Sequence, residues 1–133
     1  MLFTHTYQFS KRMQMADITR QIKEDLKQSN IQEGIIVVYT PHTTAGITIN
    51  ENADSDVVRD MLNGFERAFP THHEDYRHYE GNSHAHMKST IFGPSQTLIV
   101  SQGKIILGVW QSVYLCEFDG PRNRTFYVKI IEG

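Results

Sequence analysis

The sequence contains a single cysteine, Cys116, and no long apolar run. One cysteine excludes an internal disulfide, and the longest apolar stretches, GIIVVY and KIILGVW, are far shorter than the roughly 18 residues that a membrane span needs. The N-terminus, MLFTHTYQF, lacks the charged start and the apolar core of a signal peptide. We therefore expect a soluble, cytoplasmic protein with no membrane partner.

An excess of one charge is also lacking, as is a glycine-rich phosphate loop. The formal net charge is -2 and the basic residues are scattered, so no nucleic-acid partner is expected. Without a Walker or dinucleotide-type glycine motif, nucleotide hydrolysis and hydride transfer are disfavoured. The 133 residues show no repeat and predict one domain, 1–133, that buries about two-thirds of its unfolded surface. Such a domain needs no structural metal, so any metal is free to be functional.

The first half of the chain predicts three strands and two helices. Alternation over 2–9 indicates a half-buried strand, and 34–40 and 45–50 are β-branched runs on either side of Pro41. Apolar residues at every fourth position predict an amphipathic helix over 15–28. A wide apolar stripe over 57–69 predicts a second helix, with Asn52, Asp54 or Ser55 as its N-cap and Pro70 as its stop.

The second half predicts a loop followed by strands. Residues 71–83 are polar, rich in histidine and aperiodic, which is typical of a loop. Four strand-like runs follow at 97–100, 105–109, 112–118 and 125–131, separated by Gln102-Gly103, a bulge over 108–111 and the turn 119–121. The predicted class is α+β, a mostly antiparallel sheet or sandwich with two main helices.

Three histidines could hold a metal ion. His42 lies at a strand end, and His84 and His86 are two residues apart, which places both rings on one side of an extended segment. In a helix the two rings would diverge by about 200°, so the metal hypothesis favours a strand or an irregular turn here. Each motif also has a plain interpretation: a histidine in a turn stabilised by hydroxyls, or solvated histidines on a loop. His72, His73 and His78 are interpreted as loop residues.

The segment GVWQSVYLCEFDGPR ends in a turn that presents Arg122. An arginine held on a turn can clamp a phosphate with two hydrogen bonds, although pairing of Arg122 with Asp119 or Glu117 is an equally good interpretation. Cys116 alternates with Tyr114 and Phe118, which indicates a core thiol rather than a nucleophile.

Together, HTTAGITINENAD, GNSHAHMKSTIFGPS, the strand pair around Gly103 and WQSVYLCEFDGPRNR resemble the YjbQ family over essentially the whole chain. The resemblance implies a compact α+β fold that assembles as a homotrimer, with the histidine motifs lining a cleft. It also implies a weak, secondary thiamine-phosphate synthase activity, in which a pyrimidine diphosphate alkylates a thiazole phosphate and releases pyrophosphate.

On this resemblance, residues carry over motif by motif. His42 matches the HTTA motif, His84 and His86 match H-x-H, and Glu51, Asn52 and Asp54 match N-E-N-x-D. Trp110, Glu117, Asp119 and Arg122 match the W-Q and C-E-F-D-G-P-R segments. One departure is Ser112, which follows Trp110-Gln111 where many members have glycine.

The resulting hypothesis is a metal-dependent enzyme acting on a small phosphorylated molecule. His42, His84 and His86 hold a divalent ion, with zinc favoured and magnesium or manganese as alternatives. Glu51 or Asp54 orients a ligand or moves a proton, Arg122 and Lys88 share the charge of the pyrophosphate, and Trp110 and Asn52 contact substrate. The alternatives are a metal-dependent hydrolase of a small phosphorylated or amide substrate and a non-catalytic metabolite-binding module.

Overall fold

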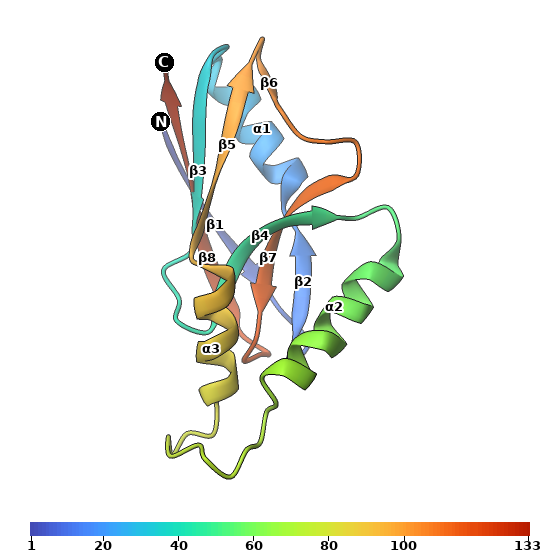
Figure 1. The fold of residues 1–133 in the computed structure, drawn as a ribbon. Helices are drawn as coiled ribbons and strands as arrows, with labels where there is room; N and C mark the ends of the chain where they lie inside the picture. Colours follow the sequence, from blue (N-terminus) through green and yellow to red (C-terminus); the bar gives the residue numbers. More distant parts are fainter.

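The computed structural model describes residues 1–133 as two antiparallel sheets and three helices (Figure 1). All strand pairs are antiparallel, so the predicted α+β class with a mostly antiparallel sheet is confirmed. None of the helices is both long and apolar enough to cross a membrane.

The larger sheet has five strands in the order β1-β8-β3-β5-β6. Their bounds are β1 Leu2–Gln8, β8 Asn123–Glu132, β3 Gly34–Tyr39, β5 Ser95–Ser101 and β6 Lys104–Ile105. Alternate residues such as Ile36 and Val38 are fully buried, whereas Ile35 and Ile99 point outward. The predicted strand over 105–109 is wrong apart from its first residue, because 106–110 form an irregular connection that turns between Gly108 and Gln111.

The smaller sheet has three strands in the order β2-β7-β4, with bounds β2 Gln14–Asp17, β7 Gln111–Glu117 and β4 Ala45–Glu51. Strand β7 is covered on both faces. One face, with Val113 and Leu115, joins the main core that it shares with the larger sheet. The other face, with Tyr114 and Cys116, forms a second cluster beneath the helices at 55–68 and 83–92.

Helix α1, Thr19–Ser29, contributes Ile22 and Leu26 to the main core between the sheets. The predicted helix began too early, because residues 14–17 pair with β7 as strand β2. Four residues are too few for periodicity to separate a strand from the first turn of a helix, so pairing with β7 decides the conformation.

Helix α2, Ser55–Ala68, begins after an Asp54 N-cap, one of the three predicted candidates, whose carboxylate accepts a hydrogen bond from the Asp56 amide at 2.9 Å. No residue of α2 is fully buried, although Val58 and Phe65 pack against the second cluster. Much of its apolar stripe is therefore left only partly covered.

Helix α3, Ser83–Phe92, was not predicted. The residues that this helix buries are His84, Ala85 and Lys88, and two of these three are polar. The sequence therefore shows no apolar stripe. The helix packs on β4, where Gly46 allows close approach: a Cβ at that position would lie 2.9 Å from the Cβ of Phe92. This contact fixes the height of the histidine-bearing helix above β4.

Candidate functional site

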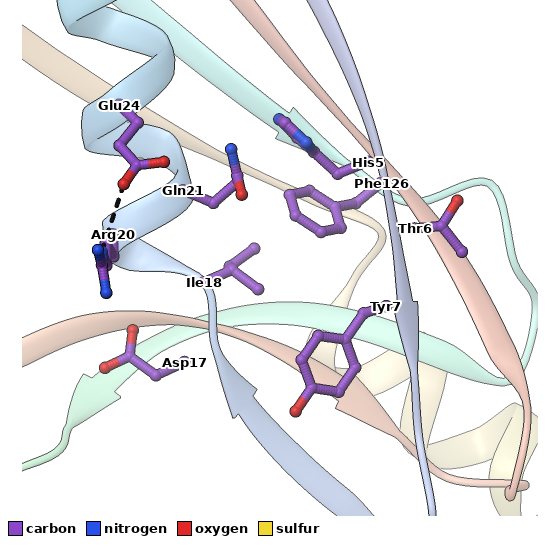
Figure 2. Close-up of a pocket in the computed structure, with 9 residues that line it drawn as sticks. All are labelled: His5, Thr6, Tyr7, Asp17, Ile18, Arg20, Gln21, Glu24 and Phe126. Carbon is purple, nitrogen blue, oxygen red and sulfur yellow. Dashed lines mark hydrogen bonds and ion pairs between the residues drawn. The ribbon is translucent and has the colours of Figure 1, made fainter.

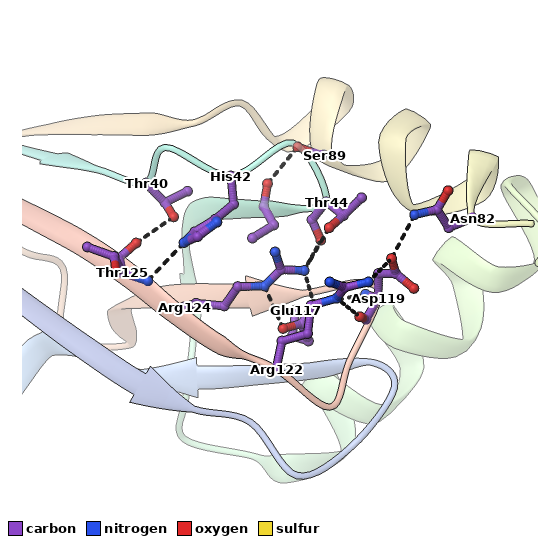
Figure 3. A network of polar contacts seen from close by, with 11 residues as sticks. Thr40, His42, Thr44, Asn82, Ser89, Glu117, Asp119, Arg122, Arg124 and Thr125 are labelled. Atoms are coloured by element: carbon purple, nitrogen blue, oxygen red, sulfur yellow. Dashed lines mark hydrogen bonds and ion pairs between the residues drawn. The ribbon is translucent and has the colours of Figure 1, made fainter. Parts of the chain in front are cut away.

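A polar cleft lies where the β3–β4 loop, the start of α3 and the β7–β8 turn meet (Figure 3). We define the cleft by His42, Thr44, His86, Arg122 and Arg124, which line a volume of about 400 Å³ together with neighbouring residues of the same segments. No hydrophobic side chain lines the cleft. Such a surface suits a charged, hydrogen-bonding group better than an apolar one.

His42 is held by the backbone of β8. Strand β3 ends at Tyr39, and the side chains that follow continue its pairing: the Thr40 hydroxyl donates to the Thr125 carbonyl at 2.8 Å, and the Thr125 amide donates to His42 Nε2 at 2.9 Å. A neutral imidazole has one acceptor nitrogen, so the proton lies on Nδ1. Burial and the positive charge of Arg124 lower the pKa of His42, which keeps it neutral near pH 7.

Arg124 forms the buried floor of the cleft. Its Nε donates to Glu117 Oε2 at 2.7 Å and its Nη2 to Glu117 Oε1, in a bidentate pair. Nη2 also donates to the Thr44 hydroxyl at 2.7 Å. Arg124 is 4% exposed and Glu117 is fully buried, so the guanidinium is held in one orientation.

Arg122 lies at the rim of the cleft. Its Nε donates to the Asp119 carbonyl at 2.7 Å and its Nη2 to the Asp119 carboxylate at 3.0 Å. Asn82 donates to the same carboxylate at 2.7 Å, which ties the start of α3 to the β7–β8 turn. The predicted pairing of Arg122 with Asp119 is confirmed, and because Arg122 also lines the cleft, the phosphate clamp stays a prediction.

Two imidazoles approach the cleft from the side of α3. His86 lines it from the helix, and His78 lines it from the preceding loop, with 5.7 Å between their ring centroids. His78 was interpreted as an ordinary loop residue, and no signal in its local sequence separates it from His72 or His73. The fold alone brings it to the site.

His84 and Lys88 lie in a different environment, buried between α3 and α2. Lys88 Nζ is 2.9 Å from Glu66 Oε1 and 2.7 Å from His84 Nδ1. Burial and the Lys88 charge lower the pKa of His84 to about 4. Burial raises the pKa of Glu66, but hydrogen bonds from the Thr71 amide and Lys88 outweigh it and lower that pKa to about 2. Neither His84 nor Lys88 is among the residues that line the cleft.

The predicted extended conformation of 84–86 is wrong, because both histidines lie on α3. Residues two apart on a helix diverge by about 200°, and here His84 is buried while His86 faces the cleft. The acceptor nitrogen of His42 is occupied by Thr125, and that of His84 by Lys88. No three histidine, cysteine, aspartate or glutamate side chains of the chain are arranged to hold a metal ion. The residues of one chain therefore do not fit a three-histidine metal centre.

The N-E-N-x-D residues and Trp110 lie at the other end of β4. The six residue steps of β4 from Ala45 to Glu51 span about 20 Å, so Glu51 and Asn52 are remote from His42 in the same chain. The side chain of Asn52 donates to Asp17 at 2.7 Å, and the backbone amide of Asn52 donates to the Trp110 carbonyl. Asp54 caps α2. Trp110 is 60% exposed. One chain does not bring these residues together with the cleft.

Sequence reasoning missed Arg124, although its position carried a signal. Residues 126, 128 and 130 are apolar and buried, and an alternation of two places residue 124 on the same inward face. A charged residue at a buried strand position requires a partner, and Glu117 on β7 supplies one. Cys116 is fully buried, as predicted, and burial raises the pKa of its thiol.

Comparison with known proteins identifies the chain. Residues 4–133 match the profile of the UPF0047 protein YjbQ-like family. The chain belongs to this family. YugU of Bacillus subtilis is 53% identical over 131 residues, which cover 98% of this chain and 99% of that protein. A UPF0047 protein of Methanocaldococcus jannaschii is 50% identical, with 98% and 94% covered.

Solved structures of the YjbQ-like family have the same fold. An uncharacterized conserved protein of Clostridium acetobutylicum is 50% identical, with a TM-score of 0.95 over 97% of this chain and 99% of that one. A YbjQ-like protein of unknown function from Sulfolobus solfataricus is 28% identical, with a TM-score of 0.95 and coverage of 100% and 97%. The chain therefore shares both the sequence pattern and the fold of the YjbQ-like family.

Proposed function

We propose that the cleft binds the phosphate or pyrophosphate group of a small organic molecule. The observation that carries this proposal is the pair of arginines, Arg122 and Arg124, held by carboxylates in a cleft whose lining is mainly polar and charged. Neutral His42, with its proton on Nδ1, adds a hydrogen-bond donor. Preorganised donors of this kind bind oxyanions without reorganising as charge develops.

As the reaction we propose the weak thiamine-phosphate synthase activity that the family resemblance implies. A pyrimidine diphosphate alkylates a thiazole phosphate: the carbon–oxygen bond to the diphosphate breaks, a carbon–nitrogen bond to the thiazole forms, and pyrophosphate leaves. The departing group takes up negative charge, which Arg122 and Arg124 are placed to stabilise. Glu51, Asp54, Asn52 and Trp110 are not assigned roles at this cleft, because they lie at the far end of β4.

Binding of inorganic pyrophosphate, measured by calorimetry, tests the site. Arg122→Met removes an exposed cation from the rim without unpairing a buried charge, and we expect about a ten-fold loss of affinity. Arg59→Met is the matched control, because Arg59 is equally charged but lies on α2 beside Asp60. Equal pyrophosphate affinity in wild type and Arg122→Met would remove the cleft from the proposal.

Product analysis separates the reactions. A synthase releases pyrophosphate from the pyrimidine diphosphate only when the thiazole phosphate is present, whereas a hydrolase releases phosphate from the first substrate alone. A metabolite-binding module binds pyrophosphate with no turnover of either substrate. We expect release that depends on the thiazole phosphate, and release without it contradicts the synthase.

A divalent metal, with zinc favoured over magnesium and manganese, remains a separate proposal from the family resemblance. The lone pairs of His42 and His84 are already used within one chain, so no step above passes through a metal. Elemental analysis of wild type and His86→Ala tests the proposal directly. Stoichiometric metal that is lost in His86→Ala supports it, and equal metal in both proteins excludes His86 as a ligand.

We also propose that the chain assembles as a homotrimer. A cyclic trimer joins two different surfaces of each copy, and this chain has one exposed apolar surface and a second that is only partly covered. One is the outer face of the larger sheet, where Leu2, Ile35, Tyr39, Ile99 and Ile131 are between 38% and 59% exposed. The other is the stripe of α2, which has no buried residue. We also propose that the protein is cytoplasmic. A lone thiol such as Cys116 stays reduced in that compartment.

A further inference from the structure

A second cavity lies between β1 and the beginning of α1, apart from the cleft (Figure 2). Its volume is about 460 Å³, within the range of small-molecule sites. None of its lining residues also lines the cleft. Strands supply its aromatic residues, Tyr7 and Phe126, whereas its charged residues come from α1 and from Asp17 just before it.

The charges around this cavity are predominantly negative. Arg20 is its one arginine or lysine, and Arg20 is already paired with Glu24 at 3.3 Å. His5 Nε2 lies 2.6 Å from a carboxylate oxygen of buried Asp25, so this ring nitrogen already has a partner within the protein. Asp17 forms no ion pair with any cationic side chain and is left as a negative charge at the wall.

Asp17 is held in place as an ionised group. Its Oδ1 accepts from the Thr19 amide at 2.9 Å and its Oδ2 from the Asn52 amide group at 2.7 Å. Partial burial raises the pKa of Asp17, but the hydrogen bonds from Thr19, Asn52 and Ser112 outweigh it, and the pKa is lowered. The carboxylate is therefore negative across the physiological range and already oriented.

The rest of the wall is apolar and aromatic. Ile18 and Phe126 are buried at its base, and Tyr7 is half-buried, with its ring 4.6 Å from that of Phe9. A carboxylate without an ion-pair partner and a half-buried tyrosine ring in the same cavity attract an organic ammonium group, the carboxylate through charge and the ring through its quadrupole. An anion is disfavoured here, since Asp17 would repel it and Arg20 is already paired with Glu24.

We propose that this cavity binds a small organic cation, an ammonium group carried on an apolar body, with Asp17 and Tyr7 as its main contacts. The proposal is independent of the phosphate site and of the reaction assigned to it. Strand β8 joins the two sites, because Arg124 lies in the cleft and Phe126 in the cavity.

Choline chloride is the probe, and 3,3-dimethyl-1-butanol is its neutral counterpart of the same shape. We expect choline to shift the backbone amide resonances of β1 and the first turn of α1, and to bind about ten-fold tighter than the alcohol. Asp17→Asn, which keeps an acceptor for the Thr19 amide, and Tyr7→Leu, which keeps an apolar side chain, should each weaken choline binding. Asp60→Asn on the surface of α2 is the charge-matched control and should not.

The midpoint of unfolding is measured for each variant as a control for folding. Asp17→Asn and Tyr7→Leu lie on different strands, so if one variant fails to fold, the other still tests the proposal. Choline binding no tighter than the alcohol overturns the proposal. So does wild-type choline affinity in both Asp17→Asn and Tyr7→Leu, or a set of shifted resonances confined to the cleft.

Discussion

The buried pair of Arg124 and Glu117 provides the sharpest test of how this fold builds its cleft. Glu117 is fully buried, and two nitrogens of Arg124 donate to its two oxygens. Arg124→Met keeps much of the side-chain volume but leaves the carboxylate without its counter-charge. The same substitution removes a cation from the cleft, so it changes both stability and binding.

The magnitude follows from the cost of an uncompensated buried charge, about 3–5 kcal/mol. A domain of this size has a free energy of unfolding of about 5–15 kcal/mol, so Arg124→Met should lose a large fraction of it. The corresponding fall in the midpoint of thermal unfolding is about 10–20 °C. In the double variant Arg124→Met/Glu117→Leu no buried charge remains, and most of the lost stability should return, to within about 2 kcal/mol.

Urea unfolding at one fixed protein concentration measures these differences, and pyrophosphate calorimetry on the same samples measures binding. We expect the double variant to be folded and stable but unable to bind pyrophosphate, which separates the structural role of the pair from its role in the cleft. Arg122→Met serves as the exposed control and should cost less than about 1 kcal/mol. An unchanged urea midpoint for Arg124→Met, or a double variant as unstable as the single one, would refute the reasoning.

Three further predictions concern acid stability, the α2 cap and assembly. His84, with its pKa lowered to about 4, binds a proton more weakly in the folded than in the unfolded chain, so the free energy of unfolding should fall by about 3 kcal/mol from pH 6.5 to pH 4. Urea unfolding across this range should show a smaller fall in His84→Gln. An equal fall in the two proteins contradicts the lowered pKa of His84. Asp54→Ala should lower the free energy of unfolding by about 1 kcal/mol through loss of the α2 N-cap. Calorimetry should find the pyrophosphate affinity of this variant unchanged, whereas a loss of affinity would make Asp54 a site residue. In sedimentation velocity the wild type should run as the proposed trimer and Ile99→Lys, on the outer sheet face, as a smaller species, while Val109→Lys, at an exposed residue of an irregular connection, should behave as the wild type. A monomeric wild type contradicts the proposed trimer, and a trimeric Ile99→Lys contradicts the outer sheet face as its interface.

The elements with strong periodicity could be predicted from the sequence. The apolar stripe and Asp54 located α2, and alternating or β-branched runs located β1, β3, β4 and β7, with bounds within one or two residues. Helix α3 could not be predicted in this way, because it turns His84 and Lys88 toward the interior where a stripe would have leucine or isoleucine. Its burial of polar groups depends on Glu66 of α2, a partner distant in sequence.

The site was predictable only in part, for a similar reason. His42, His86 and Arg122, which were named from the sequence as metal ligands and a phosphate clamp, lie together in the lining of one cleft, and their roles stay predictions. Motif spacing does not give the direction of a side chain, so it combined His84 with His86 and Glu51 with His42. The first pair point in different directions from α3, and the length of β4 separates the second. Arg124 was visible only as an inward-facing charge on an apolar strand.

The junction of Thr40, His42 and Thr125 makes the pairing between β3 and β8 sensitive to protonation at one end of the larger sheet. Backbone pairing on this side of β8 stops where β3 ends, and an imidazole takes the place of the next carbonyl. An imidazole, unlike a carbonyl, loses its acceptor when it is protonated. Protonation of His42 Nε2, which acid brings about and a nearby oxyanion favours, therefore removes the acceptor of the Thr125 amide, and the exchange rate of that one amide proton should report the charge state of His42.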